Sequence, residues 1–458
     1  MKDAQVSDSA KKEKTFSLLN LSVLLPKNPL ALLSIFKSLK HRNFALYFGG
    51  MLVTLIGAWI QQVAMGWLVY NMTNSVFLLS LSVFLSQIPT LFVTPFAGVV
   101  TDRFDRRKII MYTQGAMMLQ SLILGVLTIS GLMSVNLIMI LCFLLGVTLS
   151  FDAPARQSFY SKLVPPEDLS NAIALNSTAI NATRFIGPAI GGVMIAHWGE
   201  GVCFLVNCAT YLSILFSLRF IKTEPSPPQP RHSAFFDIAE GFSYAAHSVP
   251  IRAIIIILAV FSFFGIPFPM LMPAFAKGVL HGGSEVLGNL MSFVGIGAVT
   301  AALYLAARKR VLGLGRVVVV SSSLFGAGLI AVSFARVPWH AYVMCIPIGF
   351  GMIATAASCN TMLQSLVDEN KRGRIMSIFT MSFFGIPPLG SIAQGYIANF
   401  ISLQTMTAIS GVICIISALV FEHYRPVIRT HARAIYAQKG LIIPEIASAL
   451  QATNRKGG

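Results

Sequence analysis

Gly98-Val-Val-Thr-Asp-Arg-Phe-Asp-Arg-Arg-Lys108 is a short charged stretch between two long apolar runs, one ending near Val100 and the next starting at Ile109. A turn this short with six charges cannot lie in hydrocarbon. We therefore predict a tight hairpin between two membrane-spanning helices. Four of the six charges are basic, which places the hairpin on the cytoplasmic surface by the positive-inside rule.

Two residues of this hairpin suggest a role beyond anchoring. Gly98 lies one helical turn before Asp102 and removes side-chain bulk, so another helix can pack closely there. Asp102 would then face the N-terminus of a neighbouring helix, where the helix macrodipole favours an anion. The alternative is a charged loop that only anchors two spans.

The composition is that of a membrane protein with many spans. Of the 458 residues, 55% are hydrophobic and only 11% are charged, and the mean hydropathy is +0.73. A soluble domain carries about 25% charged residues. Many apolar runs exceed the roughly 20 residues that cross a bilayer. We predict an all-α membrane protein with the lipid bilayer as its surroundings.

The net charge of +17 would indicate a nucleic-acid partner in a soluble chain, but here the basic residues bracket apolar segments. All but three of the 34 lysines and arginines fall at one membrane surface; the exceptions are Lys277 and Arg336 in outer loops and Arg184 inside a span. This asymmetry predicts a multi-pass protein of the inner (cytoplasmic) membrane, with both termini in the cytoplasm and no nucleic-acid partner.

The sequence contains no signature of a cofactor or a metal site. The six cysteines all lie in apolar context without a Cys-x-x-Cys pair, which favours packed, unreactive thiols. No Gly-x-x-x-x-Gly-Lys-Ser/Thr loop is present, so ATP does not power the chain directly. We expect neither a metal, nor a cofactor, nor a catalytic residue: the protein is not an enzyme.

Twelve apolar spans fall into two halves separated by a proline-rich stretch. A single shift of 203 residues places Gly187 on Gly390 and Gly192 on Gly395, as a six-plus-six duplication would. Such repeats hold their site at the interface of the halves near the midplane. The predicted segments are an N-terminal cytoplasmic segment (1–43), a six-helix bundle (44–221), a cytoplasmic linker (222–250), a second six-helix bundle (251–422) and a cytoplasmic tail (423–458).

The pattern Gly98-x-x-x-Asp102-Arg103-x-x-Arg106-Arg107 resembles the signature loop of the major facilitator superfamily. Asp105 stands where that family often has Gly. The segments 59–62 (Trp-Ile-Gln-Gln), 152–157 (Asp-Ala-Pro-Ala-Arg-Gln) and 187–188 (Gly-Pro) are similar to the enterobactin-exporter-like branch of siderophore and drug efflux proteins. The resemblance implies two six-helix bundles and a conformational latch built from Gly98, Asp102, Arg103, Arg106, Arg107 and Asp152.

Asp152 is the only carboxylate that we place inside a span, near the cytoplasmic end of span 4. Two interpretations of this residue compete. In the first, it pairs with Arg106 or Arg107 of the latch, or locally with Arg156 at i+4. In the second, it is the protonatable group of a proton antiporter, with its pKa raised by partial desolvation.

Polar and aromatic residues on several spans are candidates to contact a substrate. Arg184 lies about 22 Å along span 5 at about 1.5 Å per residue, where a charge usually faces an interior cavity. The alternatives are a structural arginine and, for the other residues, hydrogen bonding between helices. The candidates are Trp59, Gln61, Gln62, Gln87, Asn181, Arg184, Phe264, Asn360 and Gln364.

Glycines and prolines indicate close packing and bending in spans 5, 7 and 11. Gly187, Pro188, Gly191 and Gly192 permit helix contact and a bend, and resemble the span 5 motif of drug–proton antiporters of the superfamily. The prolines of the stretches 264–273 and 385–388 break spans 7 and 11, which suits bending gates with adaptable apolar walls.

Together these features predict a secondary transporter that exports a small amphipathic molecule, siderophore or drug-like, by alternating access with the proton gradient as the expected energy source. Import or lysophospholipid transport on the same fold is one alternative. A non-transporting sensor or assembly protein is another. The sequence leaves open whether a periplasmic or outer-membrane partner takes part in export.

Overall fold

The computed structural model describes residues 34–221, 243–308 and 313–438. The predicted proline-rich linker up to residue 242, most of the N-terminal segment and the tail beyond residue 438 lie outside this range. Within it every element is helical. The helices are η3 (Ser34–Lys40), α3 (Arg42–Thr73), α4 (Val76–Arg103), α5 (Arg106–Ile129), α6 (Val135–Phe159), η4 (Tyr160–Lys162), α7 (Pro166–Phe220), α9 (Val249–Phe264), α10 (Pro267–Ala274), η5 (Phe275–Val279), α11 (Ser284–Ala306), α12 (Leu314–Ser333), α13 (Pro338–Leu366), α14 (Glu369–Thr380), η6 (Met381–Gly385), α15 (Ile386–Ile397) and α16 (Leu403–Gln438).

In this part of the chain, eleven helical segments are long and apolar enough to cross a membrane. One of them, α7, has 55 residues and is broken by the non-helical Gly199, with φ of 79° and ψ of 172°. At about 1.5 Å per residue its length far exceeds a bilayer, so counting it as two spans would give the predicted twelve. The boundary predicted between residues 422 and 423 falls inside α16.

The helix ends follow from local sequence. Ser75 and Ser134 cap α4 and α6 by accepting the backbone N–H groups of Leu78 and Leu137. Asp105, which departs from the signature pattern, is the N-cap of α5 and accepts the N–H of Arg107 at 2.9 Å. A side-chain cap of this kind satisfies an otherwise unpaired donor at the helix start. The charged hairpin is therefore a sharp turn between two well-capped helices.

Spans 7 and 11 are interrupted where their prolines predict a break. Span 7 is divided into α9, α10 and the π-helical turn η5, with Gly265 and Ile266 between α9 and α10. Span 11 is divided into α14, the π-helical turn η6 and α15, which begins with the Ile386-Pro-Pro segment. Proline lacks an N–H and clashes with the preceding turn, which explains the loosened helices at these points.

The predicted bend at Pro188 is not seen as a break. The residue inside α7 with non-helical backbone angles is Gly199. A positive φ of this kind is strained for residues with a side chain, so glycine sets the position of the turn between spans 5 and 6. Pro188 instead continues the helix through a region of tight packing.

The halves repeat each other in three dimensions as well as in sequence. A Cβ on Gly187 would clash with the Trp59 Cβ on span 1, and a Cβ on the matching Gly390 would clash with the Phe263 carbonyl oxygen on span 7. The shift of 203 residues thus relates two equivalent close contacts, one inside each bundle. Small residues are what permit helices to approach this closely.

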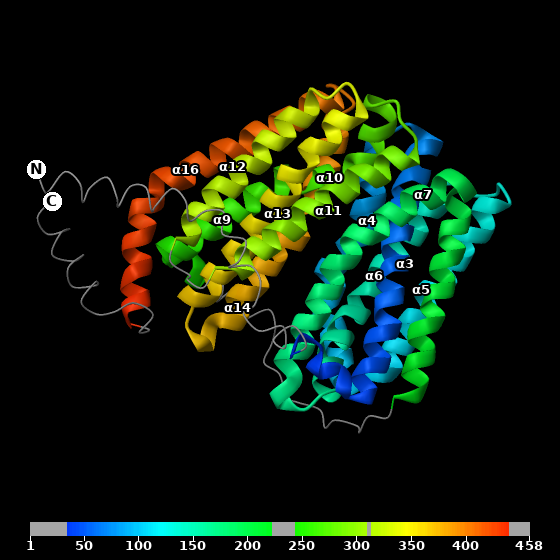
Figure 1. The fold of residues 1–458 in the computed structure, drawn as a ribbon, viewed down its shortest axis with the longest axis horizontal. Coiled ribbons are helices and arrows are strands. Elements are labelled where there is room, and N and C mark those ends of the chain that lie inside the picture. Colours follow the sequence, from blue (N-terminus) through cyan, green and yellow to red (C-terminus); the bar gives the residue numbers. More distant parts are fainter. Residues whose placement is uncertain (1–33, 222–242, 309–312, 439–458) are drawn as a thin grey trace, which may run out of the picture.

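The same shift relates two contacts between the bundles. Gly192 of α7 lies against Gly288 of α11, and Gly395 of α15 lies against Ser80 of α4. The bundles also meet where Lys277 Nζ donates to Asn71 Oδ1 at 2.5 Å. All of these residues lie toward the ends of the spans that the charge pattern predicts to be outside. In Figure 1 the bundles meet at the top of the view and spread toward the bottom.

The short helix η3 before span 1 is fastened to the start of α7. Lys37 Nζ and Lys40 Nζ lie 2.8 and 3.0 Å from the carboxylate oxygens of Asp168, and His41 Nε2 lies 2.8 Å from Asp168 Oδ2. The hydroxyl of Ser38 donates to the Asp168 carbonyl at 3.1 Å. The hydrogen bond to Asp168 holds the pKa of Lys37 above its ordinary value. The segment entering the first span is therefore attached to the N-terminal bundle.

Candidate functional site

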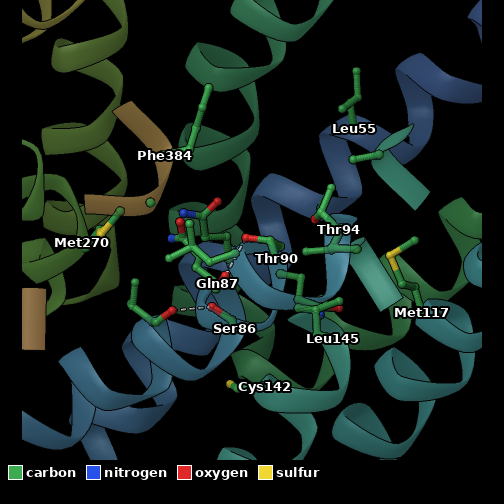
Figure 2. A pocket seen from close by; sticks show the side chains of 18 of the residues that line it. Leu55, Ser86, Gln87, Thr90, Thr94, Met117, Cys142, Leu145, Met270 and Phe384 are labelled. Atoms are coloured by element: carbon green, nitrogen blue, oxygen red, sulfur yellow. Dashed lines mark hydrogen bonds between the residues drawn. The ribbon is translucent and has the colours of Figure 1, made fainter. Parts of the chain in front are cut away.

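A cavity of about 1350 Å³ lies between the two bundles below their contacts. Its walls come from α3, α4, α5, α6 and α7 on one side and from α10, α11, α14 and η6 on the other. Figure 2 shows Gln87, Thr90 and Ser86 of α4 with Met270 and Phe384 of the opposite bundle beside them. The volume is large enough for a drug-sized ligand, since such pockets measure roughly 300–1,000 Å³.

The two walls differ in chemistry. The N-terminal bundle supplies amide and hydroxyl side chains, including Gln61, Gln62, Gln87, Gln114, Gln157, Asn207, Ser82, Ser86, Thr90 and Thr94. The C-terminal bundle supplies mainly flexible apolar side chains, including Met270, Met291, Met376, Met381 and Phe384. A surface rich in methionine adapts to ligands of different shape. The cavity is therefore amphipathic across its width.

The formal charges on the described lining are both positive. Arg156 of α6 and Arg374 of α14 line the cavity from opposite bundles, and none of the lining residues is a carboxylate. Arg156 is ion-paired to Asp152, so its charge is compensated behind the wall. The cavity therefore offers amide, hydroxyl and guanidinium groups to a polar ligand.

Gln61 is the centre of a buried polar network that joins three helices. Its Nε2 donates to Gln120 Oε1 at 3.0 Å, and its Oε1 accepts Asn207 Nδ2 at 2.6 Å and the Ser121 hydroxyl. Asn207 Nδ2 also lies 3.1 Å from the Ser121 hydroxyl. All four side chains are buried. The network fastens α3, α5 and α7 together at the inner wall of the cavity.

Asp152 is fully buried behind the cavity wall and has partners on two helices. Its Oδ1 accepts the Thr113 hydroxyl at 2.8 Å and Gln114 Nε2 at 2.9 Å, both from α5. Its Oδ2 lies 2.6 Å from Arg156 Nε, one turn further along α6. Arg156 in turn is 21% exposed in its side chain and reaches the Met51 sulfur at 3.2 Å.

Of the partners expected for Asp152, the structure has Arg156 and not Arg107. The Arg107 guanidinium instead donates to the carbonyl oxygens of Leu218 and Arg219, at 2.7 and 3.2 Å. These are the last carbonyls of α7, which a cation satisfies favourably. Arg107 thus ties the hairpin to the end of span 6 within one bundle. Gly98 and Arg106 are half-buried, and the side chains of Asp102 and Arg103 lie outside the described residues.

Arg184 and Trp59 contact each other inside the N-terminal bundle. The guanidinium carbon of Arg184 lies 5.6 Å from the centroid of the Trp59 ring, within range of a cation–π interaction. Gly187, one turn on, packs against the same tryptophan, and Gly191 packs against Ile60 and Val63. Neither Arg184 nor Trp59 is among the lining residues of the cavity. This geometry favours the alternative of a structural arginine.

The remaining candidates are dispersed. Gln61, Gln62 and Gln87 line the cavity, whereas Asn360 and Gln364 bond to each other at 2.9 Å on α13 and are not among its lining residues. The Phe264 ring packs against Phe263 with centroids 4.9 Å apart, and its carbonyl accepts Gln394. The side chain of Asn181 lies outside the described residues.

The prediction from sequence missed the polar face of α5. Thr113 and Gln120, and likewise Gln114 and Ser121, are seven residues apart and reach the two buried networks. A repeat of seven keeps residues on one face of a helix. This spacing on an otherwise apolar span was the signal that could have revealed them. Arg374 was missed because α14 carries several charges and no pattern singles it out.

Two helical bundles around a central cavity, with related glycine contacts in each half, define a membrane transporter of the major facilitator type. The family model for transmembrane secretion effectors of this superfamily matches residues 33–457. The chain belongs to this family, whose members are transporters and not enzymes.

Relatives and solved structures agree with this assignment. The chain is 26% identical to the staphyloferrin A transporter of Staphylococcus aureus, over 82% of this chain and 94% of that protein. It is 25% identical to the enterobactin exporter EntS of Salmonella typhimurium, over 81% and 89%. It is 22% identical to the macrolide efflux protein A of Streptococcus pyogenes, over 83% and 96%. The predicted resemblance to the siderophore and drug efflux branch is confirmed.

Among solved structures, the fold is similar to a bacterial homologue of the iron transporter ferroportin in its inward-facing state. The TM-score is 0.65 at 16% identity, with 84% of this chain and 98% of that chain covered. The inward-open xylose transporter XylE of E. coli gives a TM-score of 0.62 at 14% identity, with 82% and 95% covered. These similarities establish the fold and confirm the predicted fold class.

Proposed function

We propose that this protein exports a small amphipathic molecule, siderophore or drug-like, from the cytoplasm across the inner membrane by alternating access. The observation that carries the proposal is the cavity of about 1350 Å³ between the bundles, which lies below glycine contacts at the predicted outer ends of the spans. A molecule entering from the cytoplasm would reach Gln62 and Gln87 before the outer contacts open. The named functions of the relatives, which include siderophore export and macrolide efflux, support export over import.

The lining narrows the chemistry of the substrate. Amide and hydroxyl groups on one wall suit a molecule with several oxygen atoms, and methionines opposite suit an apolar or aromatic part. The described lining contains no carboxylate, so it offers a cationic substrate no oppositely charged partner.

We infer that the proton gradient supplies the energy, and Asp152 is the candidate carrier. It is fully buried, yet its partner Arg156 lies on the cavity wall. Substrate movement in inside-out vesicles with an imposed pH gradient tests this role. An Asp152→Asn variant that keeps full gradient-driven transport would eliminate Asp152 as the carrier.

Gene deletion followed by metabolite analysis of cells and medium, with and without iron, tests the direction and the substrate class. We expect a siderophore or related metabolite to accumulate in the deleted cells and to fall in the medium. Loss of uptake would indicate import, and an altered distribution of lysophospholipid would indicate lipid transport. An unchanged metabolite profile under every condition would favour a non-transporting sensor or assembly protein.

A further inference from the structure

A second cavity, of about 700 Å³, lies in the C-terminal bundle where α11 ends, α12 begins and α16 approaches the tail. It shares no lining residue with the central cavity. The cavity lies at the end of the bundle that the charge pattern predicts to be cytoplasmic. The proposed transport function uses none of its residues.

The mouth of this cavity is strongly basic. Four arginines line it: Arg308 just after the end of α11, Arg316 from the first turn of α12, and Arg425 and Arg429 from α16. One acidic neighbour is near, since Glu422 Oε1 lies 2.6 Å from Arg425 Nη2. Arg316 and Arg429 are exposed, so their charges face the solvent at the mouth. The described mouth therefore keeps a net positive charge.

The interior of the cavity is apolar. Phe350, Phe421, Val317 and Ile428 line it, and all four lie within segments able to cross a membrane. The Ser321 hydroxyl also lines the cavity and is already bonded to the Thr355 hydroxyl at 2.7 Å. The interior thus offers hydrocarbon contact and leaves little for a second polar group to bind.

The start of α12 adds to the basic character of the mouth. Gly313, the N-cap, has no side chain to accept the first N–H groups, and residues 313–316 line the cavity. An uncapped helix N-terminus favours an anion.

We propose that this cavity binds an anionic phospholipid of the cytoplasmic leaflet. The phosphate would lie among Arg316, Arg425 and Arg429, and one acyl chain would lie along Phe350 and Phe421. Basic pockets between helices on the cytoplasmic side are suited to acidic lipid head groups. A free phosphate would use the mouth but not the apolar interior, and a zwitterionic lipid would use the interior but not the net charge of the mouth. The basic mouth and the apolar interior together select an acidic lipid.

The test measures lipid retained by the purified full chain. The protein is exchanged into detergent containing equal amounts of phosphatidylglycerol and phosphatidylcholine, and bound lipid is counted by native mass spectrometry. We expect phosphatidylglycerol to be retained preferentially. Arg425→Gln and Arg429→Gln should each lower its retention about fivefold, as expected for one basic side chain near an anionic head group.

Matched controls separate this site from general surface charge. Arg252→Gln removes an exposed arginine at the same end of the bundle but outside the cavity, and Arg336→Gln removes one at the opposite end. Neither should change lipid retention by more than a small fraction. Arg429 is exposed on a helix surface, so its variant should keep the fold; thermal unfolding checks this.

Three results would overturn the proposal: equal retention of both lipids, unchanged retention in Arg425→Gln and Arg429→Gln, or displacement of phosphatidylglycerol by millimolar inorganic phosphate. The last would assign the mouth to free phosphate. The experiment measures bound lipid and not transport. The proposed lipid site can therefore be rejected without rejecting the proposed direction or substrate of transport.

Discussion

Gly192 of α7 and Gly288 of α11 face each other across the two bundles, so closely that a Cβ on Gly192 would lie 2.6 Å from the Gly288 Cα. No rotamer change can relieve this contact, because the nearest atoms belong to backbone. The contact therefore exists only while both positions are glycine and the outer ends of the bundles are together. A substitution of Gly192 should therefore act on the conformation in which the outer ends of the two bundles touch.

Gly192→Ala should shift the protein away from the cytoplasm-open conformation. Overpacking of this kind costs about 1–3 kcal/mol, and the cost falls on the conformation that holds the contact. Spin labels on Lys108→Cys and Arg252→Cys, at the cytoplasmic ends of the two bundles, should move closer together in pulsed electron resonance. Gly115→Ala is the control, since a Cβ there meets nothing within 4 Å. An unchanged distance distribution would argue against this role.

Neighbouring glutamines on α3 should behave differently when replaced. Gln61→Leu removes hydrogen bonds to Gln120, Ser121 and Asn207 and leaves buried polar groups unpaired, so stability should fall by about 1–3 kcal/mol. Gln62→Leu changes an exposed position on the cavity wall. It should alter the apparent substrate affinity and leave the unfolding temperature unchanged. Thermal unfolding in detergent and efflux assays separate the two effects, and equal loss of stability in both variants would contradict this distinction.

Asp152 and Arg156 should be strongly coupled in stability. Removing one member of a buried ion pair costs about 3 kcal/mol, because the other charge is left without compensation. Asp152→Asn should therefore destabilise the protein, and adding Arg156→Gln should recover part of the loss. A double-mutant cycle on thermal unfolding measures the coupling. Additive effects of the two substitutions would mean that the pair at 2.6 Å contributes nothing specific.

Asp168→Asn should loosen the helix η3. Asp168 has Lys37, Lys40 and His41 around its carboxylate, and both lysine side chains are more than half exposed, so the attachment should weaken with salt. Amide hydrogen exchange of residues 34–40 should accelerate, more than in the adjacent Glu167→Gln control. Exchange in that segment at the wild-type rate would contradict the attachment.

The ion pair between Lys37 and Asp168 also predicts how the attachment of η3 depends on pH. The pKa of Lys37 is raised by its hydrogen bond to Asp168, so its contribution is fully present below the ordinary lysine pKa. It is lost only as the pH rises through the raised value. Protection of residues 34–40 should therefore not decrease between neutral and mildly alkaline pH. His41 contacts the same carboxylate, so the measurement is made on His41→Gln. A loss of protection in that window in this variant would show that Lys37 does not hold the helix.

Much of the architecture could be predicted from local pattern. Apolar runs and their flanking charges predicted where most spans begin and end, although α16 continues to Gln438, past the predicted boundary at residue 422. Prolines at 267–273 and 387–388 marked the broken spans 7 and 11. The shift that aligns Gly187 with Gly390 foretold two equivalent helix contacts. These features are local or repeat along the chain, so they need no knowledge of which helices are neighbours.

The amino-acid sequence by itself determined that this chain crosses a membrane many times, in two related halves, and belongs to a transporter family. Only the tertiary structure decided that Gln61 is held in a buried network while Gln62, which lines the same cavity, is exposed, and that Arg184 meets Trp59 inside one bundle. The reason is geometric: consecutive residues on a helix point about 100° apart, and which neighbour each one meets depends on how the helices pack.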